Sequence, residues 1–203
     1  MSGKVAAVFF VSFLLQGLFP ICGSAAINPD ENTFGINLGF LSPTGTGDMK
    51  NTVKSGNLLG ASWNHNFAED VTSISEINYI TFGNKADAGI KDVSVISIPA
   101  IGRYNFTPDR ASTPYLLIGI GLNFVSKKVL DTDYYSYTSQ SLKTGIGLVA
   151  GGGFEWNFGN WYLGPEIRYQ SYATGFGGLG LLVKIAWAYE QNGSSPYRVG
   201  DLT

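Results

Sequence analysis

Hydrophobic and polar residues alternate with a period of two along most of the chain. The pattern is clearest over 145–172, where two alternating segments flank Gly159 and Asn160, a pair typical of a tight hairpin turn. Successive side chains of a strand point to opposite faces, so Trp156 falls on an apolar face and Glu155 on a polar one. The pattern therefore predicts two antiparallel strands, each with one apolar and one polar face.

Six further segments show the same alternation. The predicted strands are 33–41, 58–67, 71–82, 93–106, 115–125, 145–158, 161–172 and 178–189. The connections 42–57, 83–92 and 126–144 are long, whereas 68–70, 107–114, 159–160 and 173–177 are shorter. Two architectures fit: a soluble β-sandwich, or an all-β, eight-stranded antiparallel up-and-down transmembrane β-barrel whose apolar face meets lipid. The even strand count and the alternation of long loops with short turns favour the barrel.

Aromatic residues on the apolar faces gather at the strand ends. At the short-turn end we expect membrane-interface positions at Phe34, Trp63, Phe67, Tyr104, Phe106, Trp156, Phe158, Trp161, Trp187 and Tyr189. At the loop end we expect them at Phe40, Tyr79, Phe82, Phe124, Tyr169 and Tyr172. Two aromatic rings match the two interfaces of a bilayer, and a soluble sandwich gives no reason for them.

The N-terminus resembles a secretory signal, because Lys4 precedes an apolar run that ends before the small residues Ala25 and Ala26. We expect a cleaved signal peptide over 1–26, a barrel over 27–189 and a polar C-terminal tail over 190–203. The alternative is an uncleaved membrane anchor. Cys22 is the only cysteine and Ile21 before it argues against lipidation, so the mature chain would contain no disulfide.

Composition argues against several partners. The net charge is −2 without a basic block, so nucleic acid is not expected as a partner. Gly145, Gly147 and Ala150, with Glu166 further on, match a dinucleotide-binding fingerprint, but an alternating strand stands where that motif needs a helix. We therefore expect no cofactor and interpret these glycines as positions that face the barrel interior, or lumen.

The charged residues of the predicted strands share the polar face. They are Glu76, Arg103, Glu155, Glu166, Arg168 and Lys184. The interior of an eight-stranded barrel is just wide enough to be filled by side chains. Three acids and three bases in that space predict a lumenal charge network that closes the barrel, because an unpaired buried charge is costly. The alternative is a narrow ion or small-solute channel.

Two other sets of residues suggest chemistry only weakly. His65 is the only histidine, and its phase places it on the lipid side near the short-turn end, without a paired serine or second catalytic group in the sequence around it. The candidate partner-binding loop carries Asp131, Asp133, Tyr134, Tyr135 and Tyr137. These aspartates resemble part of a calcium loop, but its glycine and distal glutamate are missing, so no metal site is expected.

Three short stretches carry a resemblance to a known family. They are Ile98-Pro99 with Gly102-Arg103-Tyr104-Asn105-Phe106, Pro114-Tyr115 leading to Gly119 and Gly121, and Glu166-Ile167-Arg168-Tyr169. Over 33–189 the chain resembles the small eight-stranded outer-membrane barrels of the OmpA and opacity-protein type. Members of that family commonly end on an aromatic residue, whereas this chain continues past Tyr189 into its polar tail. Pro99 and Pro165 would each remove a ladder donor, so we expect bulges at both.

The resemblance and the pattern together imply an integral protein of the outer membrane of a Gram-negative bacterium. We expect a non-enzymatic monomer that contributes to envelope integrity, to surface interaction or adhesion through its loops, or to both. A lipid A-modifying enzyme is a further alternative. The expected partners are outer-membrane lipid and lipopolysaccharide, the barrel-assembly machinery during biogenesis, and an extracellular partner bound through the loops.

Overall fold

The computed structural model describes residues 31–45, 52–85, 90–131, 136–172 and 175–189. The predicted signal peptide and C-terminal tail lie outside these residues. Within them, no helix is long and apolar enough to cross a membrane.

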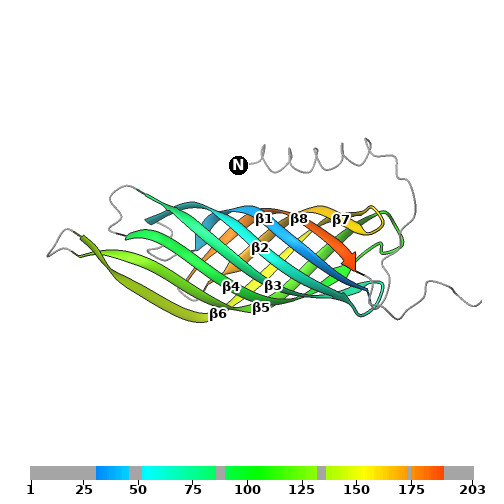
Figure 1. Ribbon diagram of the computed structural model, residues 1–203, viewed down its shortest axis with the longest axis horizontal. Coiled ribbons are helices and arrows are strands. Elements are labelled where there is room, and N and C mark those ends of the chain that lie inside the picture. The colour runs from blue at the N-terminus through cyan, green and yellow to red at the C-terminus, as the bar shows by residue number, and fades with distance from the viewer. Residues whose placement is uncertain (1–30, 46–51, 86–89, 132–135, 173–174, 190–203) are drawn as a thin grey trace, which may run out of the picture.

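Eight antiparallel strands form a closed barrel (Figure 1). The strands are β1 (Asn32–Gly45), β2 (Val53–Asn66), β3 (Val71–Asn84), β4 (Ile90–Asn105), β5 (Ser112–Asp131), β6 (Ser136–Asn157), β7 (Trp161–Ser171) and β8 (Phe176–Tyr189). Each strand pairs with the next along the chain, and β8 closes the barrel by pairing with β1 from Tyr189 opposite Asn32 to Phe176 opposite Gly45. The predicted eight-stranded up-and-down barrel is confirmed.

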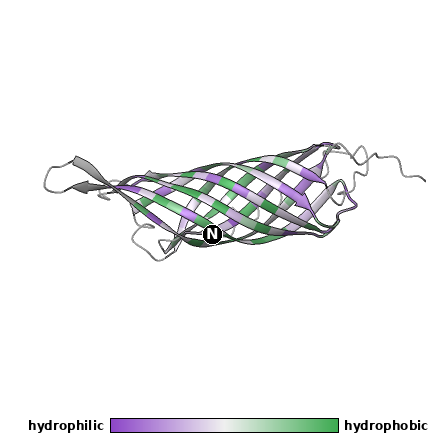
Figure 2. Ribbon diagram, turned by 60° about the horizontal axis from the view of Figure 1, so that its bottom comes forward, coloured by the Kyte–Doolittle hydropathy of each residue, from purple (hydrophilic) through white to green (hydrophobic). Residues whose placement is uncertain are grey.

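The two faces of the sheet differ as the alternation predicts. Large apolar side chains point outward, as with Phe40 at 70% and Ile118 at 72% exposure, whereas Glu166 and Asn78 point inward with no exposure. Figure 2 shows hydrophobic and hydrophilic residues alternating along the strands. An outward apolar surface that surrounds the whole barrel is the arrangement expected where lipid replaces water as the solvent.

The interior is layered along the barrel axis. At the loop end, inward apolar side chains from β1 to β5 and from β8, together with Tyr172 just after β7, pack into one cluster, which we call the apolar plug. Its residues are Leu41, Val53, Leu58, Ile80, Phe82, Val93, Val95, Val125, Tyr172, Phe176 and Leu182. Toward the short-turn end buried polar side chains, among them Asn64, Thr72 and Asn105, surround a second, smaller apolar cluster of Ile74, Ile101, Tyr115, Leu117 and Val149. The plug and this mixed layer follow one another along the lumen.

Phe82 and Tyr172 correct the expected loop-end aromatic ring. Both were expected at the membrane interface, but both point inward, with exposures of 5% and 3%. Their rings pack against Phe176 in the plug, with centroid distances of 5.6 and 5.0 Å. The sequence already contains the reason, because Phe82 shares its strand phase with Glu76, and Tyr172 shares its phase with Arg168.

The expected long connection at 126–144 is also wrong. β5 continues to Asp131 and β6 begins at Ser136, so most of the segment is a paired hairpin. The connections expected at 42–57 and 83–92 are likewise shortened, since β1 runs to Gly45, β2 starts at Val53 and β4 starts at Ile90. These strand ends are rich in serine, threonine and lysine. They lack the alternation of apolar and polar residues that predicts a strand, because a strand outside lipid needs no apolar face.

Pro99 and Pro165 lie in continuous register and do not form the expected bulges. Ladder pairs are missing beside each proline, between β3 and β4 at Pro99 and between β6 and β7 at Pro165, but the register is unchanged across both gaps. The register shifts in the described ladders fall instead at the loop end, between Val53 and Gly56, Lys91 and Ser94, and Val129 and Leu130. A missing donor therefore interrupts pairing here without adding a residue.

Candidate functional site in the barrel interior

All six predicted lumenal charges point inward from five strands. Glu76 lies on β3, Arg103 on β4, Glu155 on β6, and Lys184 on β8. Glu166 and Arg168 lie two residues apart on β7 and therefore on the same face. Barrel closure brings these strands to face one another across the lumen, so the charges meet although they are far apart in sequence.

Arg168 is the centre of a four-residue cluster. Its guanidinium donates Nη1–H and Nη2–H to the two carboxylate oxygens of Glu76, with N–O distances of 2.5 and 3.0 Å. Its Nε–H donates to Glu166 Oε1 at 2.5 Å. Lys184 Nζ lies 3.4 Å from Glu76 and 3.5 Å from Glu166, so it completes a neutral cluster of two acids and two bases.

Arg103 and Glu155 form a second pair. The guanidinium of Arg103 is bidentate on the carboxylate, with N–O distances of 2.8 and 3.0 Å. The same guanidinium lies 4.9 Å from the centroid of the Tyr115 ring, and the Tyr115 hydroxyl donates to Glu166 Oε2 at 2.9 Å. Tyr115 thus links the pair to the four-residue cluster.

Sequence reasoning missed Tyr115. The signal that could have found it is its phase, because Tyr115 precedes the outward Leu116 and is therefore inward. Asn78 is another supporting residue, and its Nδ2–H donates to Glu76 Oε2 at 2.9 Å. Gly60 faces Asn78 so closely that any side chain at residue 60 would collide with the amide.

The network is buried and electrically balanced. Arg168, Glu76 and Glu166 have side-chain exposures of 0–1%, and Lys184 reaches only 8%. Buried charges are tolerated when each has a partner and its remaining hydrogen-bonding groups are satisfied. This arrangement can tie five strands together across the lumen, but none of its members is a paired nucleophile and base. Among the described residues, no group of His, Cys, Asp or Glu could hold a metal ion.

The turn-end aromatics named from the sequence lie on the outer face. Phe34 and Trp187 make an edge-to-face contact at 5.0 Å, and Trp161 lies 5.7 Å from Trp187. Trp63 Nε1–H donates to the Tyr189 hydroxyl at 3.2 Å. Tyr104 and Phe106 also make an edge-to-face contact, with ring centroids 5.3 Å apart. Rings with one polar atom at the edge of an apolar belt suit a membrane interface.

His65 belongs to the same outer surface. Its ring lies 6.1 Å from Trp63 in a stacked arrangement and 4.7 Å from Phe67 edge-on. Its Nδ1 lies 3.1 Å from Asn32 Oδ1. Ser73 is its partner on β3, but no hydrogen bond joins their side chains in the described part of the chain. The contacts are those of an interfacial polar residue.

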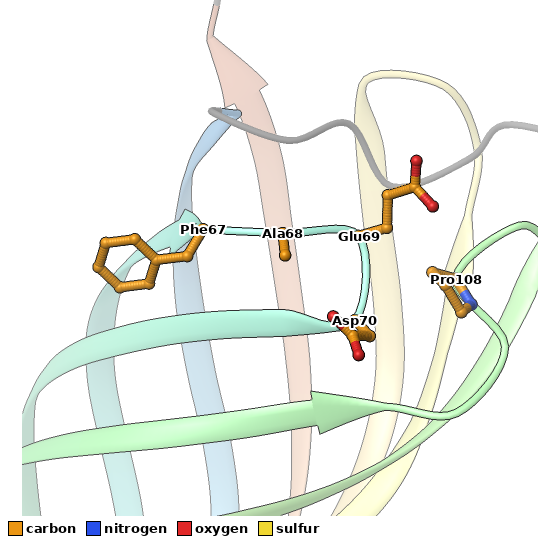
Figure 3. A pocket seen from close by; sticks show the side chains of 5 residues that line it. All are labelled: Phe67, Ala68, Glu69, Asp70 and Pro108. Carbon is orange, nitrogen blue, oxygen red and sulfur yellow. The ribbon is translucent and has the colours of Figure 1, made fainter.

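A shallow depression of about 560 Å³ lies at the short-turn end (Figure 3). It is lined by Phe67, Ala68, Glu69, Asp70 and Pro108, which come from the β2–β3 and β4–β5 turns. In Figure 3 the Phe67 ring points away from Pro108, and the side chains of Glu69 and Asp70 point in different directions. The depression is open and lacks a convergent set of polar groups, so it does not resemble a substrate pocket.

The candidate partner-binding loop lies partly beyond the described residues. Asp131 ends β5 and Tyr137 lies in β6, whereas Asp133, Tyr134 and Tyr135 fall outside. The described part of the candidate site therefore lies at the paired ends of β5 and β6.

Known proteins match this chain by structure. No family model and no curated protein sequence matches it. The neisserial surface protein A, NspA, superposes with a TM-score of 0.61 at 18% identity, covering 78% of this chain and 97% of its own. Ail, the attachment invasion locus protein of Yersinia pestis, superposes with a TM-score of 0.55 at 13% identity, covering 80% and 100%. The outer membrane enzyme PagL gives 0.51 at 16% identity, covering 74% and 97%.

These matches agree with the resemblance drawn from the three short sequence stretches. Identities this low show the fold alone. The barrel closure, the strand order and these neighbours together lead to one conclusion: the chain has the fold of the small eight-stranded outer-membrane β-barrels.

Proposed function

We propose that this protein is a closed, non-enzymatic barrel of the outer membrane of a Gram-negative bacterium that makes surface contacts through the β5–β6 hairpin. The observation that carries the proposal is the length of that hairpin. β5 has 20 residues and β6 has 22, whereas the adjoining β7 has 11. In Figure 1 the paired β5 and β6 extend past the other strands at the loop end.

The direction of the hairpin supports a surface role. Both termini of the barrel lie at the short-turn end, where a chain delivered through the periplasm leaves them. The loop end then faces the outside. Ail, a structural neighbour, has been solved in complex with the heparin analogue sucrose octasulfate, so a barrel with this fold can bind a ligand. Envelope integrity remains a role that the same barrel would serve without any partner.

The interior supports a closed barrel over a channel. The ion-pair network and the apolar plug lie in series along it, and the plug contains no charged residue. An apolar constriction is a barrier to ions, because it loses the water that would hydrate them. We therefore place conductance behind surface contact as a function.

Catalysis is the third alternative, since PagL is an enzyme on the same fold. A Ser/His/acid site would have to use His65, whose Nδ1 contacts the Asn32 amide instead of a carboxylate. The proposal accordingly assigns no catalytic residue. Its partners are outer-membrane lipid and lipopolysaccharide around the barrel, the barrel-assembly machinery during biogenesis, and an extracellular partner on the hairpin.

The experiment is a trimmed hairpin. Residues 127–141 are replaced by Asn-Gly, a pair that favours a two-residue turn, so that Ser126 and Leu142 are joined. Cells that produce the full chain are compared with cells that produce the trimmed chain for adhesion to coated surfaces and host cells. Outer-membrane fractionation and the heat-dependent gel shift of folded barrels serve as controls for targeting and folding. We expect adhesion to be lost and folding retained; equal adhesion of both strains would leave envelope integrity as the function.

A further inference from the structure

One edge of the protruding hairpin has no neighbouring strand. β6 pairs with β5 along nearly its whole length, from Ser136 to Trp156. Its pairing with β7 begins only at Val149, because β7 ends at Ser171. Among the described strands nothing continues this ladder, so the loop-end part of β6 is an exposed edge. Gly147 is buried against Ser171 and Ile146 belongs to the outer apolar face, so we define the β6 edge as residues 136–144.

The hydrogen bonds at its lower end show which residues present free backbone groups. Leu148 N–H donates to Ser171 Oγ at 2.7 Å, and Ser171 Oγ–H points back to Leu148 O at 3.5 Å. Leu148 therefore directs its backbone groups away from β5. The β5–β6 register is continuous from Ser139 to Trp156, so the period of two gives Leu142, Thr144 and Ile146 the same orientation.

The sequence of the β6 edge does nothing to block pairing. Exposed edges are usually protected by proline, by several charges or by a bulge that turns the edge away. The segment 136–144 contains no proline and one charged residue, Lys143, and its described bulge lies at its far end, between Tyr137 and Ser139. Serine, threonine, tyrosine and leucine make up most of the remainder, and all are compatible with a strand.

Charge selects the kind of strand that would fit. Lys143 is exposed on β6, and Lys127 lies on the same hairpin face, because it pairs with Ser141, two residues from Lys143. On the opposite face Lys128 is already paired with Asp92, at 2.8 Å. Inside the described part of β6 the single acid is Glu155, which is held in the lumen by Arg103. The lysine face therefore complements a strand with acidic residues at alternate positions.

We propose that the β6 edge binds an extended acidic polypeptide segment, which adds as a ninth strand through backbone hydrogen bonds to Leu142 and Thr144. Lys143 and Lys127 select its charge. Strand addition to an exposed edge is a general mode of peptide recognition, in which the main chain supplies affinity and alternate side chains supply specificity. The inference rests on the proposed surface role of the hairpin and names the class of partner.

The test uses the full chain in lipid nanodiscs and a fluorescent twelve-residue peptide of alternating glutamate and valine. Binding is followed by anisotropy, and backbone amide exchange is followed by NMR. We expect the amides of Leu142 and Thr144 to slow on binding. Leu142→Pro removes one edge donor without touching the β5 ladder and should weaken binding by about fivefold to tenfold. Leu142→Val keeps the donor and should bind as the natural chain does.

Charge is tested by a matched pair on the same hairpin. Lys143→Glu should weaken binding strongly, whereas Lys128→Glu, on the other face, should change it by less than about twofold. Heparin is the polyanion control. If heparin displaces the peptide completely while the Leu142 and Thr144 amides never slow, the site is a polyanion surface and the strand-addition proposal is wrong. If trimming abolishes adhesion but Leu142→Pro binds the peptide normally, the proposed function stands and this inference fails.

Discussion

At the scale of single residues, the neighbours of Arg168 decide how the lumen is closed. Its guanidinium uses three nitrogens on two carboxylates, with no water-exposed surface to screen the charges. A buried ion pair contributes little compared with a well-packed apolar pair, but the loss of one partner leaves an uncompensated charge. The loss of one member of the network should therefore lower the stability of the barrel by more than the intact network raises it.

Replacement of Arg168 by leucine should lower the free energy of unfolding by about 3 to 5 kcal/mol, because Glu76 and Glu166 keep only Lys184 as a shared partner. The measurement is urea unfolding in lipid vesicles, followed by the gel band of the folded barrel.

The matched control is its outward neighbour, Ile167, which is 39% exposed on the lipid face. Ile167→Arg should destabilise by about 2 to 4 kcal/mol if the residue lies near the midplane, through contact of a charge with lipid. Neutral behaviour of both variants would contradict the assignment of the two faces.

At the scale of the elements, the β5–β6 hairpin departs most from what its sequence predicts. The base of the hairpin carries apolar side chains that face lipid, as at Ile146. Nearer its tip, apolar and polar residues no longer alternate, and serines, lysines and tyrosines predominate. A strand in water on both sides has no need of an apolar face, so its pairing is held by backbone hydrogen bonds and cross-strand contacts alone. Residues 136–144 therefore resemble a loop in sequence although they form a strand.

Amide exchange should show an alternating pattern along this strand in the unbound protein. Ser141 and Lys143 direct their amides toward β5 and should exchange slowly, whereas Leu142 and Thr144 face the free edge and should exchange quickly. Uniformly fast amide exchange from 139 to 144 would show that these residues form a loop, and it would contradict the paired hairpin.

At the scale of the whole molecule, the two ends of the barrel differ in chemistry. The described turn-end residues Glu31, Glu69, Asp70 and Asp109 are acidic, with Arg110 among them, whereas lysines predominate at the loop end. The strand order and the even strand count fix both termini on the acidic side. Orientation in the membrane thus follows from the topology once one end is assigned to the periplasm.

Protease added to whole cells tests that orientation. Chymotrypsin should cut at Tyr134 and Tyr135, in the connection between β5 and β6, while the β2–β3 turn at 68–70 stays intact until the envelope is opened. Peptide mapping by mass spectrometry reads both sites. Cleavage at the β2–β3 turn of sealed cells, with the β5–β6 connection protected, would mean that the barrel is inserted the other way round.

Much of the fold was predictable because the relevant signals are local. The count of strands, the tight turn at Gly159 and the inward phase of Glu76 each depend on a few adjacent residues. The wrong predictions arise where a local signal is not sufficient. Residue type favours an interface position for Phe82 and Tyr172 although their strand phase is inward, and the effect of Pro99 and Pro165 depends on the ladder formed with neighbouring strands.

The sequence by itself determined which side chains point inward and which point outward, since a period of two is a property of the extended backbone. Only the tertiary structure decided the partners of these side chains. Arg168 meets Glu76 from 92 residues away, and Tyr115 links two ion pairs, because closure and stagger of the barrel set which inward positions lie opposite one another. The free β6 edge likewise results from a difference in length between the neighbouring strands β6 and β7, and no pattern within either strand encodes that difference.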